Sequence, residues 1–280
     1  MGDLGVDTAV EAVGEGRYRA TLSKEWEIWG PMGGYVAAVA LRAAGAESPF
    51  DRPASFFCHY LSVAGFDTVD IEVTLLRQAR TACSQRVVMT QGGKTVLDST
   101  VWSVGPVEGL EHHLPDPPEV AGPDELRPVE ELVPEDAPPP YPFWNNLESR
   151  PLEFRKDWPP PGPLPPEWRT WARFRPTATF EDPWVDACRA VVLIDVQSWP
   201  SATGPHAWQM PPFIAPSLDL YVAFHEPCPG EPWLLADGHA PAAGDGLIGW
   251  TGRLWSPGRR LVASGGGQAL CRRLPSPAGG

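Results

Sequence analysis

The sequence predicts an α+β protein built from two copies of one unit, in which a curved antiparallel sheet wraps around a single central helix. Three observations lead to this prediction: a nearly uncharged helix within residues 29–46, a series of short strands after it, and a second stretch of chain in which the same order of elements returns. A helix without a polar face has to be covered on all sides, and the strands are the part of the chain able to cover it.

The helix is predicted from a glycine-rich turn, Gly30–Gly34, that runs into an apolar segment. Only Arg42 interrupts the apolar run from Tyr35 to Ala44. A surface helix would show a polar face, so this helix should be buried. It is also too short to cross a membrane, which takes roughly 20 residues.

Strands are predicted on both sides of this helix. The clearest is residues 68–76, where Val69, Ile71 and Val73 alternate with polar residues and so share one face. Gly92 and Gly93 form a plausible hairpin turn between the last two strands. The strands expected in the first unit are residues 16–22, 54–61, 68–76, 82–90 and 95–104.

A change of composition separates the two units. Residues 106–166 are rich in proline, and the first part of this segment is also strongly acidic. Such a composition favours an extended linker, and a compact domain rarely holds so long a loop without structure. We therefore expect an N-terminal unit over residues 1–105, a linker over residues 106–166 and a C-terminal unit over residues 167–275.

The second unit repeats the first. A strand over residues 168–180 is followed by an apolar segment over residues 183–199 that takes the place of the helix, and then by further strands. A shift of about 164 positions lays residues 54–61 near residues 218–225. A tandem duplication is the economical explanation, although two β-rich stretches can also resemble each other by composition alone. The further strands are expected at residues 217–224, 233–238, 246–255 and 260–271.

The composition limits the classes of function. The 280 residues are 42% hydrophobic and 20% charged, as in a globular protein, and the net charge is −13. This charge argues against a nucleic-acid partner and against a polybasic membrane anchor. The five cysteines show no C-x-x-C spacing and are expected to be reduced. Without the pattern of a signal peptide at its start, the chain is expected to be cytoplasmic.

Several short motifs, taken in order, resemble TesB-like (thioesterase II-like) acyl-CoA thioesterases. The turn and helix start at residues 29–35 are similar to the opening helix of that family, and residues 59–61 and 217–227 are similar to two of its strands. The resemblance covers both units but not the linker. It implies a tandem (double) hotdog fold and hydrolysis of an acyl-CoA thioester without a cofactor, with acyl-CoA as the partner molecule and no insertion into a membrane.

The resemblance also implies a catalytic set of an Asp, a Ser or Thr and a Gln in the second hotdog. Asp195 is followed by Pro200 at the spacing of the family, and Ser217 stands where the family usually has Thr. The position of the family's Gln falls on Gly267, so that Gln268 comes one residue late. One residue reverses the face of a strand, and Gln268 therefore needs a bulge in the preceding glycines to reach the site.

These residue types suit thioester hydrolysis by water. A carboxylate can orient a water molecule and accept its proton, and Ser and Gln can hold the same water. Backbone N–H groups at a helix start, such as those of Gly33 and Gly34, can stabilise the oxyanion. Tyr35 and His59 complete the expected substrate contacts. No G-x-S-x-G or H-E-x-x-H motif occurs, so neither a covalent intermediate of that type nor a metal is expected.

Alternatives remain at each level. Asp195 can be a helix cap or turn residue, Ser217 can bond to the backbone, Gln268 can be an exposed strand residue, and His59 can be a core or interface histidine. The protein can bind acyl-CoA or another acyl ligand without turnover. A hotdog dehydratase would need a His/Asp pair near its helix, and none is found around residues 29–46 or 190–200. Because hotdogs pair their sheets, both a monomer and a homo-oligomer fit the sequence.

Overall fold

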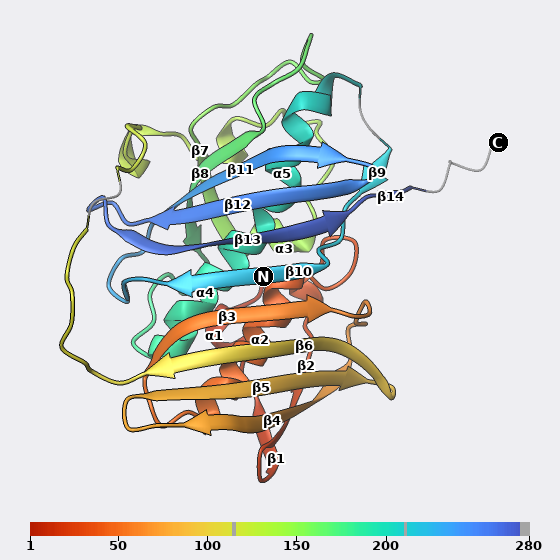
Figure 1. Cartoon of the computed structure of the whole chain (residues 1–280). Helices are drawn as coiled ribbons and strands as arrows, with labels where there is room; N and C mark the ends of the chain where they lie inside the picture. Colours follow the sequence, from red (N-terminus) through yellow and green to blue (C-terminus); the bar gives the residue numbers. More distant parts are fainter. Residues whose placement is uncertain (114–115, 210–211, 275–280) are drawn as a thin grey trace.

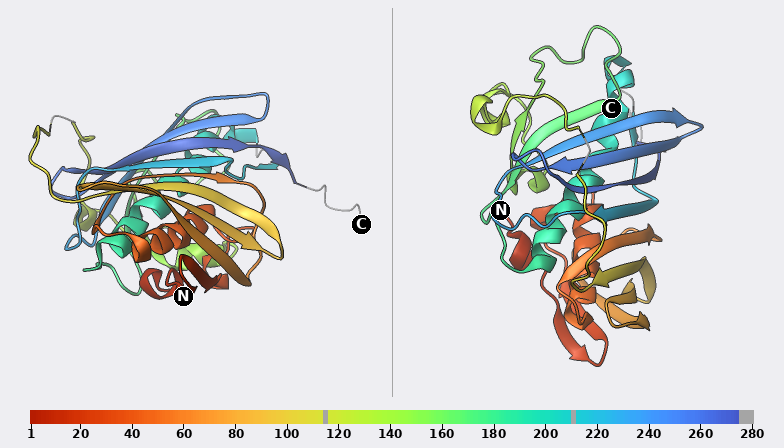
Figure 2. Two further views of the ribbon diagram at one scale, coloured as in Figure 1. Left: turned by 60° about the horizontal axis from the view of Figure 1, so that its bottom comes forward. Right: turned by 60° about the vertical axis from the view of Figure 1, so that its left-hand side comes forward.

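The computed structural model describes residues 1–113, 116–209 and 212–274. Two long helices, α2 (Gly33–Glu47) and α4 (Pro183–Val196), lie against one face of a large sheet (Figures 1 and 2). The predicted end of the C-terminal unit, residue 275, lies outside the described residues. The strands of the sheet are β1 (Glu11–Gly14), β2 (Arg17–Thr21), β3 (Arg52–Tyr60), β4 (Thr68–Gln78), β5 (Ala82–Gln91), β6 (Lys94–Val104), β7 (Leu147–Pro151), β8 (Glu167–Phe174), β10 (Asp219–Phe224), β11 (Leu234–Gly244), β12 (Leu247–Trp255) and β13 (Leu261–Leu270).

Shorter elements surround this frame. Two short strands, β9 (Phe213–Ile214) and β14 (Arg272–Arg273), pair with each other beside the main sheet. None of the described helices is long and apolar enough to span a membrane. The short helices are α1 (Leu4–Asp7), η1 (Lys24–Trp26), η2 (Pro123–Glu125), η3 (Val129–Glu131), α3 (Pro142–Asn145), α5 (Ser198–Thr203) and η4 (Gly204–Gln209).

The main sheet is antiparallel and contains the same strand order twice. Its order is β1-β2-β4-β5-β6-β3-β10-β13-β12-β11-β8-β7. The run β2-β4-β5-β6-β3 of the first half has its counterpart in β8-β11-β12-β13-β10 of the second half. In each half a first strand precedes the helix and four strands follow it. The two halves meet where β3 pairs with β10 (Figure 1), so the predicted double hotdog is confirmed.

The centre of the sheet relates the two halves by an approximate two-fold axis. In the ladder between β3 and β10, Phe57 lies opposite Tyr221. These two positions differ by 164, which is the shift expected from the internal repeat. The equivalent residues Phe57 and Tyr221 therefore face each other at the junction, as a two-fold axis at this point requires.

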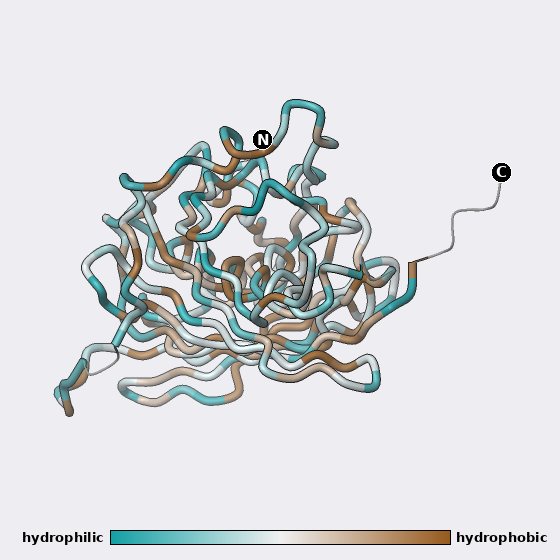
Figure 3. The backbone as a smooth tube through the Cα atoms, turned by 90° about the horizontal axis from the view of Figure 1, so that it is seen from above, coloured by the Kyte–Doolittle hydropathy of each residue, from teal (hydrophilic) through white to brown (hydrophobic). Residues whose placement is uncertain are grey.

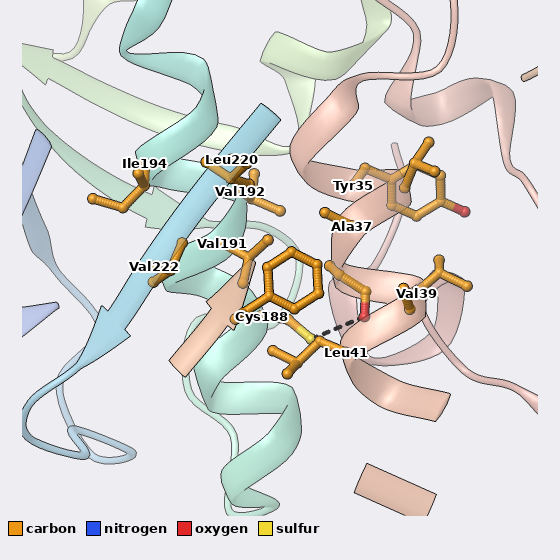
Figure 4. Close-up of a cluster of buried hydrophobic side chains, with 14 of the residues drawn as sticks. Tyr35, Ala37, Val39, Leu41, Cys188, Val191, Val192, Ile194, Leu220 and Val222 are labelled. Atoms are coloured by element: carbon orange, nitrogen blue, oxygen red, sulfur yellow. Dashed lines mark hydrogen bonds between the residues drawn. The ribbon is translucent and has the colours of Figure 1, made fainter. Parts of the chain in front are cut away.

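The two helices pack directly against each other in the concave side of the sheet. They run antiparallel: the Sγ atom of Cys188 lies 3.5 Å from the carbonyl oxygen of Ala38, and Trp184 at the start of α4 packs on Gly45 near the end of α2. Figure 4 shows labelled side chains of α4, such as Cys188, next to those of α2, such as Leu41. Small residues on α2 allow this close approach. The hydrophobic segments of both helices lie in the interior (Figure 3), which explains why α2 needs no polar face.

The segment predicted as a linker, residues 106–166, is an extended connection only in part, because some of it packs on the second half of the molecule. Its last part contains β7, which pairs with β8 and extends the main sheet. Its middle part covers the outer face of the second half, where Val120 and Leu126 pack on a cluster that includes Trp171. The indole N–H of Trp171 also donates to the carbonyl oxygen of Ala121 at 2.9 Å. The prolines disfavour regular structure here, but the apolar residues between them still bind a sheet face.

Candidate active site

Asp195 lies where the two halves of the molecule meet. It occupies the last turn of α4 and is 5% exposed. Its Oδ2 atom accepts a hydrogen bond from the N–H of Gly34 at 2.7 Å, and its Oδ1 atom accepts one from the hydroxyl of Ser217 at 2.9 Å. The carboxylate is therefore held by the start of α2 from the first half and by the segment before β10 from the second half.

Glycine at the start of α2 makes this contact possible. A Cβ atom built on Gly34 would lie 2.9 Å from the Cα atom of Val192 and 3.0 Å from the Cβ atom of Asp195. Any side chain at this position would push the two helices apart and break the hydrogen bond. The Gly-Gly pair seen in the sequence is thus a requirement of close helix packing as well as of the turn.

Burial sets the protonation of Asp195. Desolvation raises its pKa from 3.8 to about 6, although the hydrogen bonds from Ser217 and from the N–H of Gly34 act in the opposite direction. A carboxyl group with this pKa is largely ionised at neutral pH and still basic enough to take a proton from a reacting water molecule. The start of α2 also favours a negative charge at this point.

A cavity of about 460 Å³ opens beside the carboxylate. Both Gly33 and Ser217 line it together with Asp195. Among the described residues that line it, only Asp195 and Arg272 carry a charge, and most of the rest are apolar. The aromatic side chains along it are Trp29, Tyr60, Tyr141, Trp144, Trp199 and Phe213. Such a cavity fits an apolar chain whose one reactive group faces Asp195.

Gln268 does not join this group, which corrects the prediction made for it. Gln268 is exposed and does not line the cavity. Its backbone N–H donates to Oδ1 of Asp219 at 2.9 Å. The pairing of β13 with β12 is regular through Gly265–Gly267, so the bulge that would have turned Gln268 inward is absent. The period of two along the strand therefore points Gln268 away from Asp195.

The preceding residue, Gly267, faces the interior but has no room for a side chain. A Cβ atom built there would lie 2.8 Å from the ring of Trp250 and 2.4 Å from the carbonyl oxygen of Asp219. The indole N–H of Trp250 in turn donates to the carbonyl oxygen of Ile194, next to Asp195, at 3.3 Å. The place that the family resemblance assigned to a glutamine is thus filled by an indole ring.

Two further predicted substrate contacts also lie outside the cavity. Tyr35 is fully buried, stacks on Trp26 with ring centroids 5.0 Å apart, and donates its hydroxyl to the carbonyl oxygen of Asp7. His59 is exposed on the outer face of β3, where its ring lies edge-on to Phe57. Tyr35 therefore belongs to the core, and His59 points away from the site because it alternates with inward-facing residues of β3.

One cavity residue, Tyr60, was not among the predicted site residues. It follows His59 at the end of β3 and lines the cavity beside Gly33. A signal for it existed in the sequence. Neighbouring residues of a strand face opposite sides, so an exposed His59 predicts that Tyr60 faces inward.

Among the described residues, no group of three or more His, Cys, Asp or Glu side chains is placed to hold a metal ion. All five cysteines are free, and four of them are buried. Burial raises the pKa of the Cys188 thiol to about 12, which makes it unreactive as a nucleophile. The chemistry that this region can support is therefore that of a buried carboxylate, a hydroxyl group and helix-start N–H groups beside an apolar cavity.

The fold is thus a double hotdog with a buried carboxylate where its two helices meet. Comparison with protein families identifies two matches: an acyl-CoA thioesterase N-terminal domain over residues 22–104 and an acyl-CoA thioesterase C-terminal domain over residues 113–269. The chain belongs to the acyl-CoA thioesterase family and is a thioester hydrolase of the TesB-like type. Comparison with the curated proteins finds no match.

Solved structures share the whole fold. The acyl-CoA thioesterase II TesB2 from Mycobacterium marinum has a TM-score of 0.77 and 22% identity, covering 99% of this chain and 100% of its own. A tesB protein from Mycobacterium avium subsp. paratuberculosis has a TM-score of 0.78 and 20% identity, covering 96% and 98%. A hot dog fold protein of unknown function from Alicyclobacillus acidocaldarius has a TM-score of 0.78 and 19% identity, covering 98% of each chain. At these identities the likeness concerns the fold.

Proposed function

We propose that the protein hydrolyses acyl-CoA thioesters with an apolar acyl group, and that Asp195 is the general base. The observation that carries this proposal is the buried carboxylate of Asp195, which faces an apolar cavity and has a pKa of about 6. A base with this pKa combines sufficient ionisation at neutral pH with sufficient basicity.

In the proposed reaction, Asp195 accepts a proton from a water molecule while the water oxygen adds to the thioester carbonyl carbon. The carbon–sulfur bond then breaks, and the leaving CoA sulfur takes up the proton held by Asp195. The products are a carboxylic acid and free CoA. The hydroxyl of Ser217, held 2.9 Å from Oδ1 of Asp195, orients the carboxylate for this exchange.

The cavity supports the choice of an apolar acyl group. A charged group on the acyl chain would lose its hydration among mostly apolar side chains, and none of the described residues that line the cavity offers it a buried cation. Arg272, which is exposed, is the one cationic side chain among the described residues of the cavity wall, and it is available there for the phosphates of CoA.

The test is release of free CoA from straight-chain acyl-CoAs of increasing length and from a dicarboxylic acyl-CoA. We expect turnover of the straight-chain substrates, much slower turnover of the dicarboxylic one, and loss of turnover in Asp195→Asn. Faster turnover of the dicarboxylic substrate would contradict the assignment of an apolar acyl group.

A second candidate function is binding of acyl-CoA without hydrolysis. The observation that favours it is the pair of Gly267 and Trp250, which leaves no room for a glutamine side chain at position 267. Ligand-induced thermal stabilisation with no CoA release from any chain length would support binding alone and exclude the proposed reaction.

A further inference from the structure

The hydroxyl of Tyr60 is a buried polar group that the reaction described so far does not use. Its oxygen atom is buried from solvent and makes no hydrogen bond of ordinary geometry to a described residue, with the Cys58 thiol as a weakly interacting neighbour. Leaving a buried hydroxyl unpaired costs about 1–3 kcal/mol, so a position of this kind needs a reason. The side chain lines the same cavity as Asp195, at the end of the central strand β3.

The hydroxyl lies close to the carboxylate. A Cβ atom built on Gly33 would lie 2.9 Å from Oδ2 of Asp195 and 3.4 Å from the hydroxyl of Tyr60. Gly33 thus separates the two groups, and a side chain at this position would fill the space between them. Glycine keeps that space open at the wall of the cavity, where both groups can reach one small reacting centre.

The backbone N–H groups at the start of α2 differ in their availability. The N–H of Gly34 is already bonded to Asp195 and cannot serve a substrate at the same time. Gly33 is the first residue of α2, and the N–H of the first helical residue has no acceptor within its helix. One free backbone donor is thus expected beside the carboxylate, whereas most oxyanion sites offer two donors or more.

Tyr60 is protonated at neutral pH. Burial raises its pKa well above the ordinary value, and the charge of Asp195, the nearby Cys58 thiol and Asp219 add to the shift. The side chain therefore presents an O–H donor and has no tendency to act as a base.

We propose that the hydroxyl of Tyr60 is a catalytic hydrogen-bond donor to the carbonyl oxygen of the bound thioester, acting together with the N–H of Gly33. This inference rests on the proposed thioesterase function and supplies the second donor that the oxyanion requires. When water adds to the carbonyl carbon, negative charge develops on this oxygen, and a donor fixed in a site with little water stabilises that charge strongly. Substrate binding then also supplies a strong acceptor to a hydroxyl that makes no ordinary hydrogen bond to any described residue.

The first test is Tyr60→Phe, which removes only the oxygen atom. We expect kcat/KM for CoA release to fall about 10²-fold or more. The melting temperature should stay the same or rise, because an unpaired buried hydroxyl is lost. Tyr18→Phe is the matched control, since the Tyr18 hydroxyl donates to Glu47 far from the cavity; its kcat/KM should equal that of the wild type. Unchanged kcat/KM in Tyr60→Phe would overturn the inference.

The second test measures binding and does not depend on turnover. One ligand is an acyl-CoA analogue in which a methylene group replaces the thioester sulfur, so that the carbonyl group is kept; the other is an S-alkyl-CoA of equal length without a carbonyl group. Tyr60→Phe should bind the ketone about tenfold more weakly, a loss of one hydrogen bond, and bind the thioether unchanged. Equal losses for both ligands, or none for either, would assign the hydroxyl to another role.

The two tests separate failure of this inference from failure of the proposed function. If the wild type releases CoA and Tyr60→Phe matches it, only the role of Tyr60 is wrong. If the wild type releases no CoA from any acyl-CoA, the proposed function is wrong, and the ketone and thioether still decide whether Tyr60 binds a carbonyl oxygen.

Discussion

The starts of α2 and α4 are equivalent places in the duplicated fold, yet only one of them faces a reactive group. The two helices begin at Gly33 and Pro183, positions that differ by 150. The same shift relates Gly34 to Trp184 and Gly45 to Asp195. In one place the N–H of Gly34 meets the carboxylate of Asp195; in the other the indole ring of Trp184 covers Gly45. At the start of α4, the indole ring of Trp184 thus occupies the space next to Gly45.

The carboxylates near the two helix starts have opposite properties. Asp182 caps α4 by accepting from the N–H of Trp184 at 2.8 Å and forms an ion pair with Arg42 at 2.6 Å. Burial pushes its pKa upward, but these partners outweigh burial and hold the pKa below the ordinary value. Asp195 forms no ion pair with a described residue, so burial dominates and raises its pKa. Asp182 is thus held ionised by Arg42 and by helix N–H groups, which favours stability, whereas burial keeps Asp195 basic.

The largest expected effect distinguishes these two carboxylates. Asp195→Asn should lower kcat/KM for CoA release by about 10²–10⁴-fold, the usual contribution of a general base. Asp182→Asn should leave kcat/KM unchanged, since asparagine also caps helices well and the site lies at the other end of α2. Steady-state CoA release by the purified variants measures both, and a comparable loss in Asp182→Asn would contradict the assignment.

The stability of Asp195→Asn shows whether its loss of activity is chemical. Because the folded-state pKa is raised from 3.8 to about 6, the folded protein binds more protons than the unfolded chain between these values. Charged Asp195 therefore destabilises the fold above pH 6, by up to about 3 kcal/mol, and this cost disappears as the pH falls towards 4. Urea unfolding should find Asp195→Asn more stable than the wild type at pH 8 and nearly equal at pH 4. A less stable variant at pH 8 would contradict the raised pKa.

The glycines at the two places give the next effect. Gly34→Ala and Gly45→Ala should both cost about 1–3 kcal/mol of stability, because each new methyl group overlaps the opposite helix. The Cβ atom would lie 2.9 Å from Val192 in the first variant and 2.6 Å from the ring of Trp184 in the second. Only Gly34→Ala displaces Asp195, so only it should lose activity. Thermal unfolding and kcat/KM of the two variants test this, and equal losses of activity would remove the distinction.

Ser217→Ala should have a smaller effect that depends on pH. The hydrogen bond from Ser217 lowers the pKa of Asp195, so its removal raises that pKa. At pH 6 the base is then less ionised than in the wild type, and kcat/KM should fall further there than at pH 8. The ratio of variant to wild-type rate at these two pH values is the measurement, and a ratio independent of pH would assign Ser217 a role unrelated to the ionisation of Asp195.

The smallest effect is expected for Gln268. Its side chain points away from the cavity, so Gln268→Ala should leave kcat/KM and its pH dependence unchanged. A large loss of CoA release in this variant would show that β13 presents its other face to the substrate.

The fold could be predicted from the sequence because its signals are local and repeated. An apolar helix after a glycine turn and cleanly alternating strands such as residues 68–76 specify buried faces without reference to the rest of the chain. The part that failed, β7 and the packed middle of the linker, depends on a sheet edge and an outer face formed by distant residues. The aromatic residues within residues 141–147 indicate contact with a folded part of the chain, but no local pattern within residues 106–166 identifies the surface.

The site could be predicted in part. Asp195 and Ser217, singled out at a distance of 22 residues in sequence, lie in hydrogen-bond contact, because the family resemblance depends on elements whose order this chain keeps. The direction of Gln268 could not be predicted, since it depends on the regular pairing of three consecutive glycines that could equally have formed a bulge. His59 was chosen over Tyr60 for its chemistry, although strand alternation makes these neighbours face opposite sides.

The most direct test of the account is the pH dependence of kcat/KM for hydrolysis of an acyl-pantetheine thioester, which lacks the titrating phosphate of CoA. We predict a rise of kcat/KM with pH that follows a single ionisation with an apparent pKa near 6, the value expected for buried Asp195, and no such rise in the residual activity of Asp195→Asn. A profile that is flat between pH 4.5 and 8, or the same rise in both proteins, would contradict the assignment of Asp195 as the general base.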